Sequence, residues 1–382
     1  MPQPAERYYE DYRYYSQQNY ARPQLKSVKP IRTADKKKVE RNRFIHRIIS
    51  FLFVAVVAFG LLPIGFNKIT KHIFNPTPYK KITTDYQQIV FPTTNYLSNH
   101  WFMGMRSFVN TAKKPQMTTP IENSELAPLK NEIKYIASTY PEIKPSVYVW
   151  DYQTGDYVDF NADEIYPTAS IIKLPVLTEL FRSIEKGFVS LDEKMTLTDY
   201  YMTEGSGSLQ YKGLNSQYSI DTLARVMITE SDNSATNMLM ARLGSMTDVN
   251  SAIRQWGLKH TYVQTWLPDL EGTNHSTARD MATILYNLDN PKFLSNESRA
   301  KIFDYMGHVH NNRLIAAGLP QGVEFLHKTG DIGKMLGDAG IVFAPNGKKY
   351  IVVMLVNRPH NSPLGKEFIV KASETIYNYM VK

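Results

Sequence analysis

Ser170 and Lys173 lie three residues apart in the apolar stretch "YPTASIIKLP". If a helix begins near Ser170, side chains at i and i+3 share one face, so the lysine amine lies beside the serine hydroxyl. Neighbours such as Ile171 and Ile172 would bury both groups. Burial disfavours the ammonium form and lowers its pKa, which makes lysine a usable base for a serine nucleophile. Taken alone, such a pair is more often an ordinary helix start whose lysine reaches solvent.

Two later segments add to this pair. "MITESDNSATNML" places Ser-Asp-Asn at 231–233 between two helical patterns, and "EFLHKTGDIG" places Lys-Thr-Gly at 328–330 on a predicted strand. Ser-x-x-Lys, Ser-Asp-Asn and Lys-Thr-Gly occur in this order in class A β-lactamases and penicillin-binding proteins. From about Glu122 to Lys382 the sequence resembles that family, and "GSGSLQ", "TWLPDL" and "STARDMATIL" look like further family segments.

The resemblance implies a role for each motif residue. Ser170 would attack a lactam or D-alanyl peptide carbonyl to form an acyl-enzyme, and Lys173 would take its proton. Ser231 would relay a proton to the leaving nitrogen, while Lys328 would keep the region positive and tune Ser231. Backbone N–H groups of Ser170 and Asp331 would form the oxyanion hole. The substrate-binding residues would be Asn233, Thr329, Gly330 and Asp331.

One departure from the family concerns release of the acyl group. In class A β-lactamases a glutamate follows the tryptophan of the Ω loop and activates water, but "WLPDLE" has Leu267 at that place. Leucine cannot polarise water. Glu271 would supply the missing base from a shifted position or would face solvent, and Asp269 is a further candidate. Fast deacylation is therefore not expected, while acylation is.

A second departure is "KTGD", with Asp331 where the family usually has a small or hydroxyl residue. Its carboxylate would repel a substrate carboxylate unless Lys328 or Lys334 compensates. The arginine that often assists on the next strand is missing, with Gly337 near that place. We therefore expect penicillins to bind poorly and the natural substrate to differ in charge.

Strands at both ends and helices in the middle must position these residues. Alternating residues predict two strands within 145–160, across a turn at Gly155, and a second hairpin about Asn346 and Gly347. Helical spacing marks residues 122–140, the middle of the chain and a final stretch at 365–380. This indicates an α+β fold of the class A β-lactamase type: an antiparallel sheet flanked by helices, with an all-helical subdomain, preceded by one transmembrane helix.

The N-terminal third predicts a membrane anchor. Residues 22–47 carry ten Lys or Arg against two acids, which accounts for the net charge of +8, and residues 48–66 carry no charge over a length that spans a bilayer. The positive-inside rule places residues 1–47, a disordered basic tail with a possible cytoplasmic partner, in the cytoplasm. Residues 67–121 would be an extracellular stalk, or a small folded piece or membrane-surface contact, and residues 122–382 the extracellular catalytic domain. A cleaved signal is the rival interpretation, although no cleavage site follows the apolar run.

Composition excludes several other classes. The chain has no cysteine, so disulfides, thiolate nucleophiles and cysteine-bound zinc are ruled out. The basic residues gather beside the apolar run, which indicates orientation in a membrane and no nucleic-acid partner. His308 and His310 lack an evident third ligand, so we expect a surface pair and no metal, and no cofactor motif is present.

Three hypotheses follow. The first is an anchored serine β-lactamase of the class A type that deacylates slowly. The second is a D,D-peptidase or penicillin-binding protein that acts on D-alanyl cell-wall peptides and is trapped by β-lactams. The third is a penicillin-binding sensor or non-catalytic binding protein whose cytoplasmic tail reports acylation or occupancy.

Overall fold

Five strands form one antiparallel sheet in the order β2-β1-β9-β8-β7, as a computed structural model of the chain describes it for residues 117–382. The predictions for residues 1–116, including the membrane-spanning helix, lie outside the described residues. The first and last parts of the domain both supply strands: β1 (Lys144–Asp151), β2 (Tyr157–Phe160), β7 (Glu324–Ile332), β8 (Met335–Phe343) and β9 (Lys349–Asn357). Both predicted hairpins are confirmed, and β1 joins them by pairing with β9 along its whole length.

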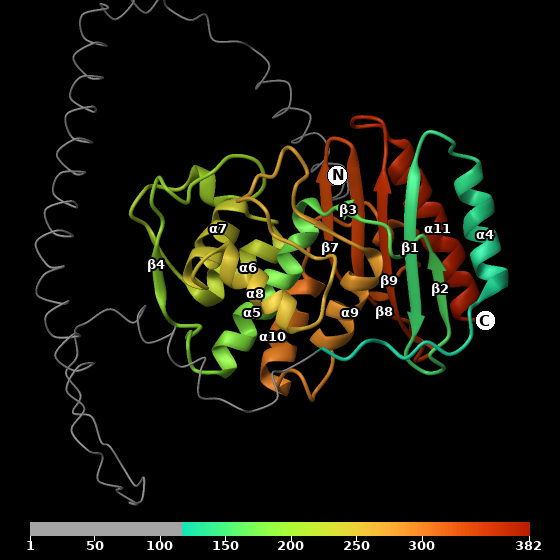
Figure 1. Cartoon of the computed structure of the whole chain (residues 1–382), viewed down its shortest axis with the longest axis horizontal. Helices are drawn as coiled ribbons and strands as arrows, with labels where there is room; N and C mark the ends of the chain where they lie inside the picture. The colour runs from blue at the N-terminus through green and yellow to red at the C-terminus, as the bar shows by residue number, and fades with distance from the viewer. Residues whose placement is uncertain (1–116) are drawn as a thin grey trace, which may run out of the picture. The chain divides into compact units, whose positions relative to one another are not determined.

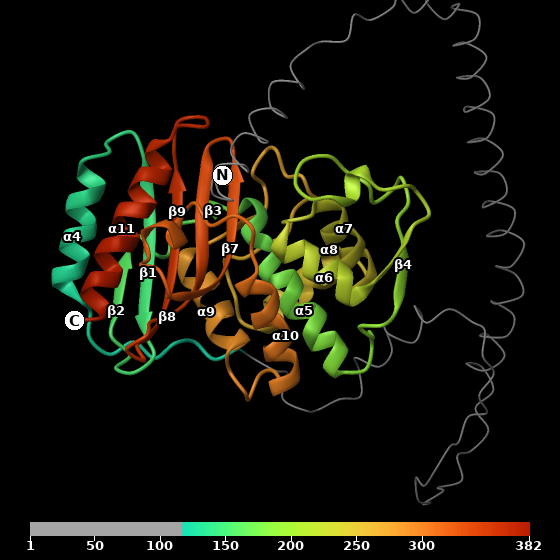
Figure 2. The same cartoon turned by 180° about the vertical axis from the view of Figure 1, so that it is seen from behind.

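Helices cover both faces of the sheet (Figure 1). α4 and α11 pack together on one face, as the view from behind also shows (Figure 2), while α9 lies against β1, β8 and β9 from the other. The remaining helices form the predicted helical part, next to β7. The helices are α4 (Ala127–Ser138), α5 (Lys173–Glu185), α6 (Ile220–Thr229), α7 (Asn233–Arg242), α8 (Met246–Gln255), α9 (Ala278–Leu288), α10 (Asn296–Gly307) and α11 (Leu364–Met380).

Short elements connect these layers. Two small antiparallel pairs flank the helical part, β3 with β6 and β4 with β5. They and three 3₁₀ turns have the bounds β3 (Tyr166–Pro167), β4 (Lys194–Thr196), β5 (Gln217–Ser219), β6 (His275–Ser276), η1 (Ala169–Ile172), η2 (Leu209–Tyr211) and η3 (Ile315–Gly318). Thr277 caps α9 by accepting a hydrogen bond from the Asp280 N–H.

The hydrophobic core has two parts, one on each face of the sheet. The larger part packs the helices from α5 through α10 against one face of β7, β8 and β9. The smaller part lies between the other face of the sheet and the helices α4 and α11. β7 is an edge strand of this sheet and borders the helical part. The three motifs, at the starts of α5 and α7 and on β7, therefore meet where the helical part borders the sheet.

The first described residues pack on this domain. Met117 is buried, and its N–H donates to the Trp256 carbonyl at 3.3 Å. The Thr118 N–H donates to the Asn287 side-chain carbonyl at 3.1 Å. Residues 117–121, which the sequence assigns to the end of the stalk, thus contact the domain in this structure.

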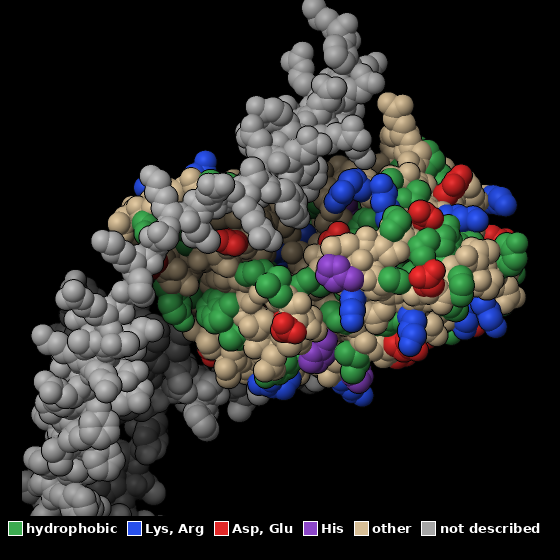
Figure 3. All heavy atoms as spheres, turned by 90° about the horizontal axis from the view of Figure 1, so that it is seen from above, with side chains coloured by type: hydrophobic (Ala, Val, Ile, Leu, Met, Phe, Trp, Pro, Cys, Tyr) green, Lys and Arg blue, Asp and Glu red, His purple; other side chains and the backbone are tan. Residues whose placement is uncertain are grey.

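The surface is of mixed charge. On the face seen from above, Lys and Arg lie among Asp and Glu (Figure 3). Within residues 117–382, no helix combines the length and apolarity needed to cross a bilayer.

Candidate active site

Ser170 lies in a tight turn directly before α5. The sequence predicts a helix from about Ser170, but the α-helix begins at Lys173 and Ser170 belongs to the 3₁₀ turn η1. Ala169 has a φ of 45°, which is unusual for a residue with a Cβ and bends the chain at the nucleophile. The Ile171 N–H donates to the Thr168 carbonyl at 2.9 Å and closes the turn. Ser170 thereby remains partly exposed at the start of a buried helix.

Lys173 is fully buried among oxygen atoms. Its Nζ lies 2.9 Å from Ser170 Oγ, 3.1 Å from Ser231 Oγ, 2.8 Å from the Ser231 carbonyl oxygen and 2.9 Å from Asn233 Oδ1. Burial holds the pKa of Lys173 well below its ordinary value, the nearby Lys328 lowers it further, and Asp232 opposes both effects. A neutral amine at this position can accept the serine proton, which is the chemistry predicted from the Ser-x-x-Lys spacing.

Ser231 is held in place by the start of α7. It has a φ of 59°, and the Asp232 carboxylate caps the helix by accepting from the Ala235 N–H at 2.8 Å. The same carboxylate accepts from the Leu209 N–H at 2.8 Å, so the loop at 205–210 is fastened to the motif. A Cβ on Gly207 would lie 2.1 Å from an Asp232 oxygen, so only glycine fits this approach.

β7 supplies the Lys-Thr-Gly segment, which packs against the turn that carries Ser170. Lys328 is fully buried, its Nζ donates to the Thr329 carbonyl at 2.8 Å, and burial lowers its pKa to about 7. A Cβ on Gly330 would lie 2.6 Å from the Thr168 carbonyl oxygen, so glycine lets β7 approach the nucleophile turn. Lys328 is thus only partly charged near neutral pH, and its electrostatic effect falls on Lys173.

Asp331 has a partner that the sequence does not predict. Arg358, directly after β9, donates from Nη2 to Asp331 Oδ1 at 2.5 Å. The cation that compensates Asp331 is therefore neither Lys328 nor Lys334, because the short loop after β9 brings an arginine beside the end of β7. Gly337 faces Gly330 across the β7–β8 ladder. The only signal for Arg358 in the sequence is its place at the end of the last strand.

The loop at 264–274 contains two carboxylates, and neither contacts Lys173 or Ser231 in this structure. Glu271 is exposed. Asp269 is 2% exposed and accepts from the Thr273 N–H at 2.9 Å and the Asn274 N–H at 2.6 Å. The Leu267 side chain is buried at 4% exposure. Its backbone N–H donates to the Asn237 side-chain carbonyl at 3.0 Å, and the Asn237 amide donates back to the Leu267 carbonyl at 2.8 Å.

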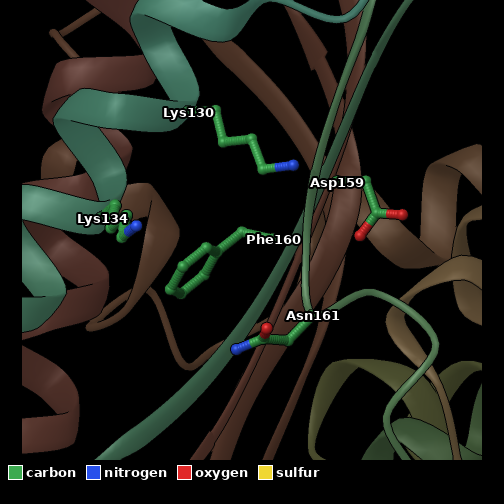
Figure 4. A pocket seen from close by; sticks show the side chains of 5 residues that line it. All are labelled: Lys130, Lys134, Asp159, Phe160 and Asn161. Carbon is green, nitrogen blue, oxygen red and sulfur yellow. The ribbon is translucent and has the colours of Figure 1, made fainter.

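A separate pocket of about 500 Å³ lies between α4 and β2 (Figure 4). Lys130 and Lys134 from α4 face Phe160 and Asn161, while Asp159 points away. The pocket contains none of the motif residues. In the described part of the chain no group of three or more His, Asp or Glu side chains is placed to hold a metal ion.

Comparisons with known proteins agree with this geometry. The sequence model described as "Beta-lactamase enzyme family" matches residues 128–380. The β-lactamase of Bacillus licheniformis is 25% identical over 63% of this chain and 79% of its own length, and β-lactamase 3 of Bacillus cereus is 27% identical over 56% and 69%.

Solved structures give the same family. The structure of PBP-A is 38% identical, covers 69% of this chain and 98% of its own, and superposes with a TM-score of 0.66. A leucine-to-glutamate variant of PBP-A, solved as an acyl-enzyme complex with penicillin G, is 37% identical with the same TM-score. A β-lactamase from Chitinophaga pinensis, 19% identical with a TM-score of 0.62, shares the fold. This chain therefore belongs to the β-lactamase enzyme family and is an active-site serine hydrolase with the class A β-lactamase-like fold.

Proposed function

We propose that this chain is acylated at Ser170 by β-lactams, hydrolyses the lactam amide, and releases the acyl group slowly. The observation that carries the first step is the buried Lys173 amine, which lies 2.9 Å from Ser170 Oγ and 3.1 Å from Ser231 Oγ. These distances allow one amine to serve both hydroxyls. The solved acyl-enzyme complex of a leucine-to-glutamate variant of PBP-A with penicillin G supports the same step here.

Acylation follows from the positions of these groups. As Ser170 Oγ attacks the lactam carbonyl, its proton passes to neutral Lys173, and the backbone N–H groups of Ser170 and Asp331 stabilise the oxyanion. The C–N bond then breaks. Lys173 returns the proton through the Ser231 hydroxyl to the leaving nitrogen, so the ring opens without net proton loss. Asn233 and Thr329 hold the substrate's amide and carboxylate, respectively.

Slow deacylation follows from the loop at 264–274. Hydrolysis of the ester requires a base that activates water on the acyl group. Leu267 presents hydrocarbon, the Asp269 carboxylate is already occupied by backbone N–H groups, and Glu271 is exposed. Water attack therefore proceeds without a positioned carboxylate from this loop.

The test follows the intact mass of the full-length chain after addition of a fluorescent penicillin. We expect an adduct that persists, and none with Ser170→Ala. Leu267→Glu should shorten the adduct's lifetime, while Leu267→Gln, which has the same size but no basic carboxylate, should not. Absence of an adduct in the wild-type chain would refute acylation, and fast turnover that Leu267→Glu leaves unchanged would refute the role of Leu267.

A second candidate is a D,D-peptidase that acts on D-alanyl cell-wall peptides. It is favoured by the same loop, because an enzyme that β-lactams trap needs acylation but not fast release of penicilloate. Release of D-alanine from a D-alanyl-D-alanine peptide, absent in Ser170→Ala, would support it. Turnover of penicillin with no release of D-alanine would support the β-lactamase instead.

The proposal includes a cell-membrane anchor. The uncharged stretch at 48–66 and the ten basic residues before it support a single span with the N-terminus in the cytoplasm and the catalytic domain outside. Protease added to intact cells should then remove the catalytic domain and leave a tag at residue 1 protected. The tail at 1–47 would be available to a cytoplasmic partner, which a pull-down with the membrane-bound chain would test.

A further inference from the structure

Asp331 and Arg358 form a fixed ion pair beside the nucleophile. In addition to its bond with Asp331, Arg358 donates from Nη1 to the Ser362 carbonyl at 3.0 Å. Two backbone bonds fasten the loop after β9 to the β7–β8 turn, from the Arg358 N–H to the Lys334 carbonyl at 2.8 Å and from the Asn361 N–H to the Gly333 carbonyl at 2.9 Å. The pair is therefore part of the fold and not a chance surface contact.

The two partners differ in exposure. The Arg358 side chain is 7% exposed, whereas the Asp331 side chain is 44% exposed. The guanidinium thus lies behind the carboxylate, and solvent faces the negative end of the pair. A ligand that approaches from solvent therefore meets the carboxylate of Asp331 before the guanidinium of Arg358.

The position of Asp331 relates this exposed carboxylate to the reaction. Thr329 and Asp331 share one face of β7 because side chains alternate along a strand. Gly330, between them, packs against the nucleophile turn so closely that a Cβ there would lie 2.6 Å from the Thr168 carbonyl oxygen. A substrate that reaches Ser170 along this edge therefore passes the exposed carboxylate.

The other cationic side chains near this edge are placed differently from Arg358. Lys328 is fully buried on the opposite side of β7 and donates to the Thr329 carbonyl. Lys334 and His360 are exposed, and the ion pair of Asp331 in the described part of the chain is with Arg358. Asp331 thus presents an exposed carboxylate on the face of β7 that also carries Thr329.

We propose that Asp331 is a specificity-determining residue that selects acyl donors whose leaving group carries a cationic ammonium group and disfavours those whose leaving group carries a carboxylate. Arg358 is a positioning residue that holds the Asp331 carboxylate. This inference rests on the proposed acyl transfer to Ser170, and it adds the charge of the leaving group to that function.

The test uses acyl thioesters that share a benzoylglycyl group and differ in the thiol. Ser170 Oγ bonds to the acyl carbon, the C–S bond breaks, and the serine proton leaves with the thiol, so thiol release measures the rate. Mercaptoacetate and mercaptoacetamide compare a carboxylate with a neutral group. Thiocholine and 3,3-dimethylbutanethiol compare a cation with a neutral group of the same shape. Each ester is assayed as kcat/KM with the full-length chain in detergent.

We expect the wild-type chain to prefer thiocholine over its neutral match and mercaptoacetamide over mercaptoacetate. Asp331→Asn, which keeps the size of the side chain, should lower the ratio of the thiocholine ester to its neutral match about tenfold and raise the ratio of mercaptoacetate to mercaptoacetamide about tenfold. Asp331→Ser should have the same effects. Arg358→Gln should shift the ratios in the opposite direction, and Arg358→Lys should restore them. High salt should reduce all these preferences.

Two outcomes would overturn the inference. One is a wild-type preference for the mercaptoacetate ester, and the other is an Asp331→Asn variant that changes the four esters by the same factor. Failure of the proposed function is distinguishable, because then no ester is cleaved and no penicillin adduct forms. A merely structural effect of Arg358 would change all rates together and leave the ratios unmoved.

Discussion

Lys328→Met should stabilise the domain while it impairs acylation. Lys328 is fully buried, and burial lowers its pKa from the ordinary value of 10.5 to about 7. Below pH 7 the folded chain must keep an ammonium group in a dry site. Methionine has a similar length without the charge, so the substitution removes this cost at the loss of one hydrogen bond to the Thr329 carbonyl.

The size of the effect follows from proton linkage. Between pH 7 and 10.5 the unfolded chain binds more protons at Lys328 than the folded chain, so wild-type stability rises with pH in this window. Each unit of difference between the pKa values of Lys328 in the folded and unfolded chains corresponds to about 1.4 kcal/mol. The charged lysine therefore lowers the free energy of unfolding by about 5 kcal/mol below pH 7. Between about pH 6 and about pH 9 the penalty should fall by about 3 kcal/mol.

Urea unfolding followed by tryptophan fluorescence measures the difference. The stability of Lys328→Met minus that of the wild type should be positive at about pH 6 and should shrink by about 3 kcal/mol toward about pH 9. Lys173 is present in both chains, but the substitution removes the lowering of its pKa by Lys328, which adds to the difference in the same direction. A difference that stays constant across this range would refute the assignment of a depressed pKa to Lys328.

Three further predictions concern the same site. The rate of acylation should fall above about pH 7, by about tenfold per pH unit, as Lys328 loses its proton, and a rate that is flat to about pH 9 would contradict this. Asp232→Ala should lower the free energy of unfolding by about 2–4 kcal/mol and slow acylation, because α7 loses its cap and the Leu209 N–H loses its acceptor. Unchanged urea unfolding would show that the cap is dispensable. Asp269→Asn should speed hydrogen exchange at 264–274 without changing the rate of acylation; a selective loss of deacylation with unchanged exchange would instead make Asp269 a base.

Local signals in the sequence predict most of the fold. The turns at Gly155 and at Asn346-Gly347 lie between alternating strands, so both hairpins follow from neighbouring residues. Likewise, the cap at Thr277 and the final helix depend on residues within a few positions of each other. The order of the strands depends on a further prediction, that strands from the two ends of the domain pair with each other. The pairing of β1 with β9 confirms it.

The part of the site that could be predicted is the part in which the spacing of motif residues determines which side chains touch. The spacing of Ser170 and Lys173 predicts their contact even though the local structure is a 3₁₀ turn, because i and i+3 are also neighbours there. Arg358 was not predictable, since its bond to Asp331 depends on three strands in register and a short loop. For the same reason the sequence gives no sign that Asn237 fixes the backbone of Leu267.

The pairing of β1 with β9 has a consequence for the kinetics of folding. These neighbours in the sheet are about two hundred residues apart in the chain, so the sheet has a high contact order and should form slowly. During synthesis the helical part, with Ser170, Lys173 and Ser231, emerges before β7 exists. A nascent chain would therefore carry its nucleophile without an oxyanion hole, and reactivity toward acyl donors would arise only when the last strands have docked.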